Sequence, residues 1–224
     1  MKEPNVILDL NNIRGKNRSH DPIKKDKIGN DPLKFSCEWI KDALNLDIVN
    51  PNSAIVSSAS LSGDIIKPNA RVVLVKEVNE KGYVFYSHYN SVKGQELENN
   101  PYVSLLFFWD DLARQIRISG KIEKLSPEKS DEYFHSRPRG SQISACISNQ
   151  SKPILDRQSL DEKMNRLSIE LEGKDINRPD TWGGYLIIPE QIEFWQGQHD
   201  RMHDRILFVK NNNSREWEKS RLEP

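Results

Sequence analysis

Residues 113–125 carry the pattern that most restricts the fold of this 224-residue chain. Apolar and polar side chains alternate there with a period of two, which is typical of a β-strand with one face in a core and the other in water. The side chains expected to point inward are Ile116, Ile118 and Ile122, and those expected to point outward are Gln115, Arg117, Ser119, Lys121 and Glu123.

The segment before it, Val103–Trp109, is apolar at almost every position. A strand with two apolar faces must be covered on both sides, either by the core of its own chain or by another subunit. We therefore expect this segment to lie at the centre of the sheet or at a contact between subunits.

Similar patterns, separated by Gly, Pro and Asn turn signals, predict further strands at about 53–60, 71–77, 82–87, 184–195, 202–209 and 216–222. Helices are predicted after Asp31-Pro32, over 91–99, from Ser126-Pro127 to about Ser136, and after a capping box at Ser159–Glu162. Many antiparallel strands with few helices predict a mainly β fold, a small barrel with helices packed outside. The polar residues 1–30 are predicted to be a flexible N-terminal arm, and residues 31–224 a single domain.

Charge and cysteine content exclude several functional classes. Lys+Arg and Asp+Glu both number 33, so bulk electrostatic binding to nucleic acid or to an anionic membrane is not expected. Cys37 and Cys146 form neither a disulfide framework nor a CxxC metal motif, and the histidines lack zinc-site spacing. The cysteine usage fits a reducing, cytoplasmic setting. No membrane helix or secretory signal is apparent.

Near the C-terminus, Arg201, His203 and Arg205 are spaced two residues apart, downstream of Trp195 and Gly197. If this segment is extended, all three side chains point from one face. Two guanidinium groups beside an imidazole suit a planar, anionic ligand. A solvated hairpin face with coincidental spacing explains the same pattern equally well.

Three more clusters suit anions, although each also has an ordinary structural explanation. Arg71 and Lys76 lie at the two ends of an apolar run. In a regular strand their side chains point to opposite faces, so they share a ligand only if the strand bends or bulges. Otherwise they are the solvated ends of the strand. Ser87 and Lys93 lie near a helix start, where backbone N–H groups suit phosphate but Ser91 would also serve as a simple N-cap.

The third cluster combines Tyr133 and Arg137, which are four residues apart and share a helical face, with Ser141 beyond the following turn. Together they could bind one phosphate, or form an ordinary basic helix end. Taken together, the clusters suggest a phosphorylated cofactor stacked against a phosphorylated substrate. No GxGxxG, P-loop or GxSxG motif is present.

These clusters fall within motifs that resemble the FMN-dependent pyridoxine (pyridoxamine) 5′-phosphate oxidase family, from about Asp31 to Pro224. The matching motifs, in order, are RVVLVK (71–76), FYS (85–87), SVKG (91–94), ENNPYVSLLFFW (98–109), RQI (114–116), YFHSRPRGSQI (133–143), NQS (149–151), WGG (182–184), EFWQG (193–197), RMHDR (201–205) and the final RLEP.

The resemblance implies a split β-barrel, that is, a Greek-key antiparallel barrel with peripheral helices, and a homodimer with active sites at the subunit interface. It also implies FMN-dependent oxidation of pyridoxine and pyridoxamine 5′-phosphates to pyridoxal 5′-phosphate, with O2 as electron acceptor. By the same resemblance, FMN contacts are expected from Arg71, Val72, Val73, Leu74, Val75, Lys76, Tyr86, Ser87, Lys93, Gln115, Gln150, Ser151, Trp195 and Arg205. Substrate phosphate contacts are expected from Lys76, Tyr133, Arg137 and Ser141, and ring contacts with a catalytic role from Arg201 and His203.

The chain departs from the family pattern at two places. Val92 replaces the usual Arg before Lys93, so one cofactor-phosphate contact is expected to be missing; a charge-assisted hydrogen bond contributes about 1.5–3 kcal/mol. Ser144-Ala145-Cys146 replaces the usual Gly-Ala-Trp, which alters packing near the flavin. Two alternatives stay open: a related split-barrel flavin oxidase of another ring compound, such as a phenazine-pathway oxidase, and a non-catalytic protein that binds flavin or pyridoxal phosphate.

Overall fold

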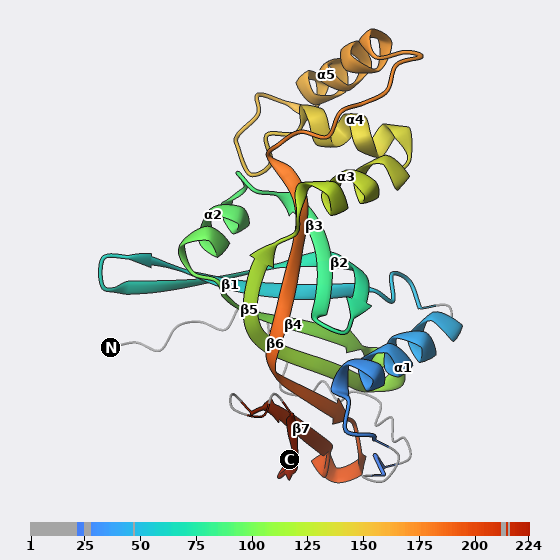
Figure 1. Ribbon diagram of the computed structural model, residues 1–224, viewed down its shortest axis with the longest axis vertical. Coiled ribbons are helices and arrows are strands. Elements are labelled where there is room, and N and C mark those ends of the chain that lie inside the picture. Colours follow the sequence, from blue (N-terminus) through green and yellow to red (C-terminus); the bar gives the residue numbers. More distant parts are fainter. Residues whose placement is uncertain (1–21, 25–27, 47, 212–213, 215) are drawn as a thin grey trace, which may run out of the picture.

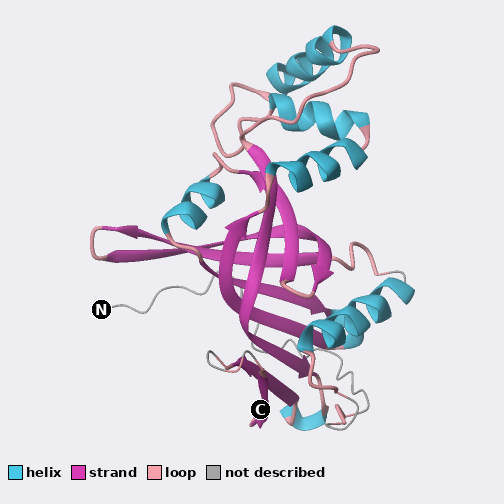
Figure 2. Cartoon of the chain, viewed as in Figure 1, coloured by secondary structure: helices cyan, strands magenta, loops and turns pink. Residues whose placement is uncertain are grey.

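The computed structural model describes residues 22–24, 28–46, 48–211, 214 and 216–224. In this part of the chain eight strands form one antiparallel sheet in the order β3-β2-β1-β4-β5-β6-β7-β8, and a further pairing of β3 with β6 closes β1 to β6 into a barrel (Figures 1 and 2). The strands are β1 (Ser53–Ser62), β2 (Ile65–Asn79), β3 (Gly82–His88), β4 (Tyr102–Trp109), β5 (Arg114–Lys124), β6 (Trp182–Gln196), β7 (Asp204–Lys210) and β8 (Trp217–Leu222).

The alternating segment is β5, and its predicted inward residues Ile116, Ile118 and Ile122 are buried in the barrel. They pack in one apolar core with Leu105 and Phe194, whose strands flank β5 on either side. The prediction of a mainly β barrel with helices outside is thus confirmed. The main difference in extent is in β2, which begins at Ile65 because residues 65–70 pair with β1 in a projecting hairpin.

Helices α3 (Pro127–Ser136), α4 (Arg139–Ile147) and α5 (Arg157–Glu170) gather beyond one end of the barrel, while α1 (Pro32–Asn45) and α2 (Val92–Asn99) lie beside it (Figure 1). The helical end has a second apolar cluster, which includes Phe134, Ile143 and Trp182. Two short 3₁₀ turns, η1 (Asp110–Leu112) and η2 (His199–Arg201), complete the described helices.

Two expectations about the helices are wrong. A turn was expected at Pro138-Arg139-Gly140, but Arg139–Ile147 form the helix α4. The capping box at Ser159 is also wrong, because α5 starts earlier, with Asp156 as the N-cap: its carboxylate accepts hydrogen bonds from the backbone N–H and the hydroxyl of Ser159, at 2.7 and 2.6 Å.

One side of the sheet remains open to solvent in the single chain. We call it the open face, and it consists of the outward apolar residues Ile55, Val72, Leu74, Leu106 and Phe108. Ile55 pairs with both Val72 and Leu106, so the patch runs continuously across β2, β1 and β4. Val72 is 64% exposed and Phe108 55% exposed. The core thus covers one side of the central strand β4, and the other side is uncovered. Another subunit or a ligand would have to cover that second side.

Most of the expected N-terminal arm, residues 1–21 and 25–27, lies outside the described residues. Its described part lies against the C-terminal strands: the backbone N–H of Ile23 donates to Asp204 at 3.0 Å, and Lys219 donates to the carbonyl of Ile28 at 2.8 Å. Of the described helices, none has the length and apolar character needed to cross a membrane.

A close approach of backbones at Gly94 fixes α2 against β3. A Cβ added there would lie 1.9 Å from the carbonyl oxygen of Tyr89. We therefore expect Gly94→Ala to lower the free energy of unfolding by about 1–3 kcal/mol, measured by urea denaturation, because the helix must shift. Gly140→Ala in α4 is the matched control, since its nearest new contact is Met164 Cε at 3.9 Å. Equal stability of the two variants would contradict this account.

Candidate active site

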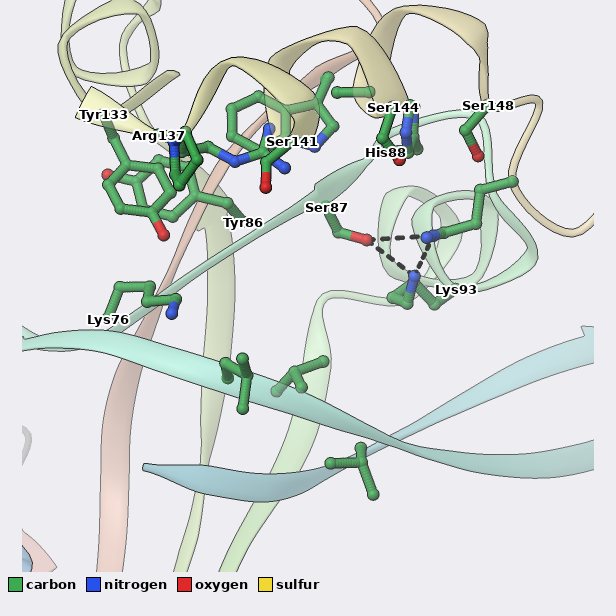
Figure 3. Close-up of a pocket in the computed structure, with 17 residues that line it drawn as sticks. Lys76, Tyr86, Ser87, His88, Lys93, Tyr133, Arg137, Ser141, Ser144 and Ser148 are labelled. Atoms are coloured by element: carbon green, nitrogen blue, oxygen red, sulfur yellow. Dashed lines mark hydrogen bonds between the residues drawn. The ribbon is translucent and has the colours of Figure 1, made fainter. Parts of the chain in front are cut away.

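A cavity of about 480 Å³ lies where β2 and β3 face α2, α3 and α4 (Figure 3). Residues from strands, helices and a loop line it, so the packing of the helical end onto the barrel creates it. It brings together most of the predicted site residues: Val72, Val73, Leu74, Lys76, Tyr86, Ser87, Lys93, Tyr133, Arg137, Ser141 and Gln150. Six further residues that were not predicted also line it: His88, Pro138, Ser144, Ala145, Ser148 and Trp182.

One end of the cavity is built around Lys93, in the first turn of α2. Its ammonium donates to Ser87 Oγ at 2.7 Å and to the side-chain oxygen of Gln150 (Figure 3). Both partners are neutral, so the charge is solvated but not neutralised. Burial, and secondly the nearby guanidinium of Arg71, lower the pKa of Lys93 to about 8. This end of the cavity would therefore gain from an anion.

Arg71 lies beside this end but does not line the cavity. Its guanidinium donates to Ser58 Oγ at 2.6 Å and to Glu96 Oε2 at 2.8 Å. Burial tends to raise the pKa of the Glu96 carboxyl, but hydrogen bonds from Ser58, Asn69 and Arg71 lower it overall. The carboxylate thus offsets the charge of Arg71, and the predicted contact of Arg71 with a cofactor phosphate stays a prediction.

The opposite end of the cavity is formed by Tyr133, Arg137 and Ser141 (Figure 3). The ring of Tyr133 stacks on Tyr86, with centroids 3.8 Å apart and planes 17° apart. The guanidinium carbon of Arg137 lies 4.5 Å from the ring centroid of Trp182, a cation–π contact. Among the described residues, Nη1 of Arg137 is buried and has no hydrogen-bond partner. An unpaired buried donor is costly, and an anion at this end would satisfy it.

Lys76 lines this end of the cavity and lies at a β-bulge in β2. The pairing of β2 with β3 shifts between Val75 and Glu77, which leaves Lys76 as the extra residue. Lys76 lines the cavity together with Val72 and Leu74, whereas Arg71, of opposite parity, does not line it, so the bulge does not bring Arg71 and Lys76 into one cavity. Lys76 extends toward Tyr133 in Figure 3.

The residues missed from sequence cluster near α4. Ser144 in α4 and Ser148 at its C-cap follow the predicted Ser141 at the spacing of one helical face, and all three line the cavity. Because no helix was predicted over 139–147, the spacing of these serines did not indicate that they share a face. His88, on β3, is buried beside them, and burial, then Lys93 and Arg137, lower its pKa, which favours a neutral ring. Trp182 was expected only as the first residue of the WGG motif, without a contact assigned to it.

Five other predicted residues form a second set away from this cavity: Gln115, Trp195, Arg201, His203 and Arg205. Gln115 pairs with Trp195, which pairs with Arg205, so these three side chains share one face of the sheet. Phe108 of the open face pairs with Gln115 and extends the same row. The second set therefore lies at the far edge of the open face from Val72 and Leu74.

Residues 201–205 are not extended throughout, so the condition for Arg201, His203 and Arg205 to point from one face is not met. The strand β7 begins only at Asp204, and Arg201 ends the 3₁₀ turn η2 with a left-handed φ of 60°. Arg205 is on the strand, where it donates to Glu193 Oε1 and to the carbonyl of Glu223, both at 2.9 Å. Arg201 and Arg205 thus do not project as neighbouring residues of one strand.

Three predicted cofactor contacts lie in neither set: Arg71, described above, Val75 and Ser151. The Val75 side chain points into the barrel core, so only its backbone is available to a ligand on the other side of β2. Ser151 follows Gln150 with a left-handed φ of 72°. Among the described residues, no group of three or more His, Cys, Asp or Glu side chains could hold a metal ion.

Comparison with known proteins places this geometry in a family. Residues 40–168 match the family model described as pyridoxamine 5′-phosphate oxidase, and residues 182–224 match the pyridoxine 5′-phosphate oxidase C-terminal dimerisation region. The chain is 41% identical over 219 residues to a pyridoxine/pyridoxamine 5′-phosphate oxidase of Trichormus variabilis, covering 98% of this chain and 99% of the relative. It is 45% identical over 195 residues to that of Psychromonas ingrahamii, covering 87% and 88%.

Two solved structures share the fold. PhzG from Burkholderia lata 383, in complex with tetrahydrophenazine-1-carboxylic acid, has a TM-score of 0.84 at 25% identity and covers 92% of this chain and 100% of its own. A pyridoxamine 5′-phosphate oxidase-related, FMN-binding protein of Nostoc punctiforme has a TM-score of 0.70 at 13% identity. The match covers 88% of this chain and 100% of the Nostoc chain. This likeness confirms the expected split-barrel architecture. By motif order, fold and the identity of its relatives, the chain belongs to the pyridoxamine 5′-phosphate oxidase family.

Proposed function

We propose that this chain is a pyridoxal 5′-phosphate synthase with bound FMN. It oxidises pyridoxine 5′-phosphate to pyridoxal 5′-phosphate and reduces O2 to H2O2. With pyridoxamine 5′-phosphate it also consumes water and releases NH3. The proposal includes a reducing, cytoplasmic setting, which suits the free cysteines Cys37 and Cys146.

The unpaired Nη1 of Arg137 is the observation that carries the choice of substrate. It lies at the end of the cavity where a tyrosine, a serine and a lysine also converge, a set that matches the acceptor oxygens of a phosphate. A ring substrate without phosphate, such as a phenazine, would leave this donor unsatisfied. The same argument favours a B6 phosphate although the PhzG structure shares the fold.

The residues at the Lys93 end fit the phosphate of FMN. Lys93 carries a charge without an anionic partner, and Ser87 and Gln150 stand within hydrogen-bond reach of it. Val72 and Leu74 offer an exposed apolar surface between the two ends, suited to the flat isoalloxazine ring. When bound, FMN supplies the redox chemistry, accepting a hydride equivalent from the substrate and returning the electrons to O2.

The protein's own residues supply position and charge. Arg137, with Tyr133 and Ser141, would bind the substrate phosphate at one end of the cavity. Lys76 would approach the same phosphate from the bulge in β2. Arg201 and His203 would cover and orient the substrate ring. Binding of the remote phosphate thus fixes the reacting carbon, which is how distant contacts contribute to the rate.

Because Arg201 and His203 lie away from the cavity of their own chain, we propose that they act on the cavity of a partner. Four strand spacings of about 4.8 Å separate β2 from β6, or roughly 19 Å across the open face. A two-fold axis through the middle of that face would bring the second set of one subunit onto Val72 and Leu74 of the other. It would also bury the exposed Ile55 and Phe108 and the half-buried Leu106.

The direct test of the function is an absorbance spectrum of the purified protein. We expect flavin bands that bleach when pyridoxine 5′-phosphate is added without oxygen and return when air is admitted. Unphosphorylated pyridoxine should bleach them only at much higher concentration, because the Arg137 end of the cavity then stays empty. Flavin that stays oxidised with the phosphorylated substrate would favour a non-catalytic binding protein.

The lowered pKa of Lys93 predicts how FMN affinity depends on pH. A phosphate favours the charged ammonium, so affinity should be constant below pH about 8 and then weaken by up to about tenfold per pH unit as Lys93 loses its proton. Titration of the cofactor-free protein by flavin fluorescence measures this. Riboflavin, which lacks the phosphate, and Lys93→Arg, which keeps its charge, should both lack the slope. An unchanged slope in Lys93→Arg would assign the titration to another group.

Shared active sites predict complementation between two inactive variants. Arg137→Leu disables the cavity, and Arg201→Leu disables the second set. After subunit exchange in an equal mixture, about a quarter of wild-type activity should return, because half of the dimers are mixed and each has one intact site of two. Each variant alone, treated in the same way, is the control. If both sets served the same subunit, no activity would return.

A further inference from the structure

The loop between β6 and β7 holds the ring of His203 by one nitrogen. The backbone N–H of Gln198 donates a hydrogen bond to Nδ1 of His203, with an N···N distance of 3.1 Å. The Trp195 ring lies against the imidazole, with centroids 4.7 Å apart and planes 46° apart. One nitrogen is therefore occupied and one face is covered, which leaves Nε2 as the polar atom that can reach a ligand.

The donor of this hydrogen bond is itself fixed by the fold. The side-chain amide of Gln196, which is buried, donates to the carbonyls of Leu112 and Ala113 at 3.0 and 3.1 Å. The N–H of Gly197 donates to the same Ala113 carbonyl at 2.7 Å. A Cβ at Gly197 would lie 2.9 Å from that of Ala113, so only glycine permits this approach. The backbone that carries the Gln198 N–H is thus tied to the turn before β5.

Beyond Gln198 the chain reverses through Asp200 and Arg201, whose φ angles are 53° and 60°. Left-handed backbone at two consecutive non-glycine residues is unfavourable by about 1–3 kcal/mol each and is retained only where its surroundings impose it. The reversal returns His203 to the Gln198 N–H. It also places Arg201 on the same short loop as His203.

The acceptor role of Nδ1 determines where the ring carries its proton. A neutral imidazole has one N–H, and a nitrogen that accepts a hydrogen bond cannot be the one that bears it. The proton is therefore on Nε2. In the charged ring Nε2 is protonated as well, so in neither state does Nε2 present a lone pair.

We propose that His203 acts in catalysis as a hydrogen-bond donor through Nε2–H to an oxygen of the bound substrate, and not as a base. This inference rests on the proposed function, which brings His203 to the substrate. The hydroxyl proton that an alcohol substrate loses on oxidation then passes to water and not to His203. The role of the Gln198 amide is to hold the donating tautomer and the direction of the ring.

The tautomer is measured directly by long-range ¹H–¹⁵N correlation NMR on protein labelled at histidine, recorded with and without FMN. The His203 signals are assigned by their loss in His203→Gln. We expect a pyridine-type Nδ1 and a pyrrole-type Nε2 in both samples. A proton on Nδ1 would overturn the proposal. Because the cofactor-free sample needs no turnover, this result is independent of whether the proposed reaction occurs.

Two substitutions separate a donor from a base. The Gln amide of His203→Gln can donate from near the Nε2 position but cannot accept a proton, so kcat should stay within about tenfold of wild type, as for loss of geometry in one hydrogen bond. His203→Leu, which has no donor, should be slower than His203→Gln. If His203 were a base, both variants would lose about 10²–10⁴-fold equally. His199→Gln, an exposed histidine on the same loop, is the matched control and should leave kcat unchanged.

Discussion

The pairing of β6 with both β3 and β5 is the constraint on which the rest of the structure depends. Residues Trp182–Gln196 pair with β3 at one end, with β5 along most of their length and with β7 at the other end. The two glycines after Trp182 leave room for neighbouring side chains: a Cβ at Gly183 would lie 2.1 Å from the Tyr89 hydroxyl, and one at Gly184 would lie 2.5 Å from Leu125 Cδ1. The same strand thus closes the barrel, brings Trp182 to the cavity and carries Trp195 to the second set.

Anion binding in a chain of zero net charge depends on which cations lack anionic partners. Arg71 is offset by Glu96, and Arg205 shares the carboxylate of Glu193 with Arg117. Lys93 has neutral partners, and one nitrogen of Arg137 has none among the described residues. These two lie at opposite ends of one cavity, where low dielectric strengthens their attraction for phosphate. Local pairing, and not overall composition, therefore defines where anions can bind.

The strands and helices that were predicted correctly are those whose buried side chains recur periodically in the sequence or whose first residues carry a capping signal. β5 alternates because one face is in the core, and α3 carries the Ser-Pro start that its N-cap uses. The outer part of β2 was missed, because residues 65–70 are exposed on both sides and no burial pattern marks them. α4 was missed because Pro138-Arg139-Gly140 reads as a turn, and with it the face of Ser144 and Ser148 was lost.

The sequence allowed many of the site residues to be predicted, but not their arrangement in space. Motif resemblance identified the cationic and aromatic side chains, yet no pattern in RMHDR shows that Arg201 adopts a left-handed backbone, since residues other than glycine rarely do. The bulge at Lys76 was recognised only as one of two conditions for a shared ligand. Nor does any local pattern show that the predicted residues divide between two ends of the open face, because that depends on strand order.

The open face has a consequence for how this protein would behave on dilution. If the neighbouring chain completes each cavity, as proposed, FMN binding would strengthen self-association by the same factor by which self-association strengthens FMN binding. Separated chains would expose the apolar row from Val72 to Phe108 and would hold flavin only by the Lys93 end. Supply of the vitamin-derived cofactor would then govern not only how many sites are active but how many assembled molecules exist.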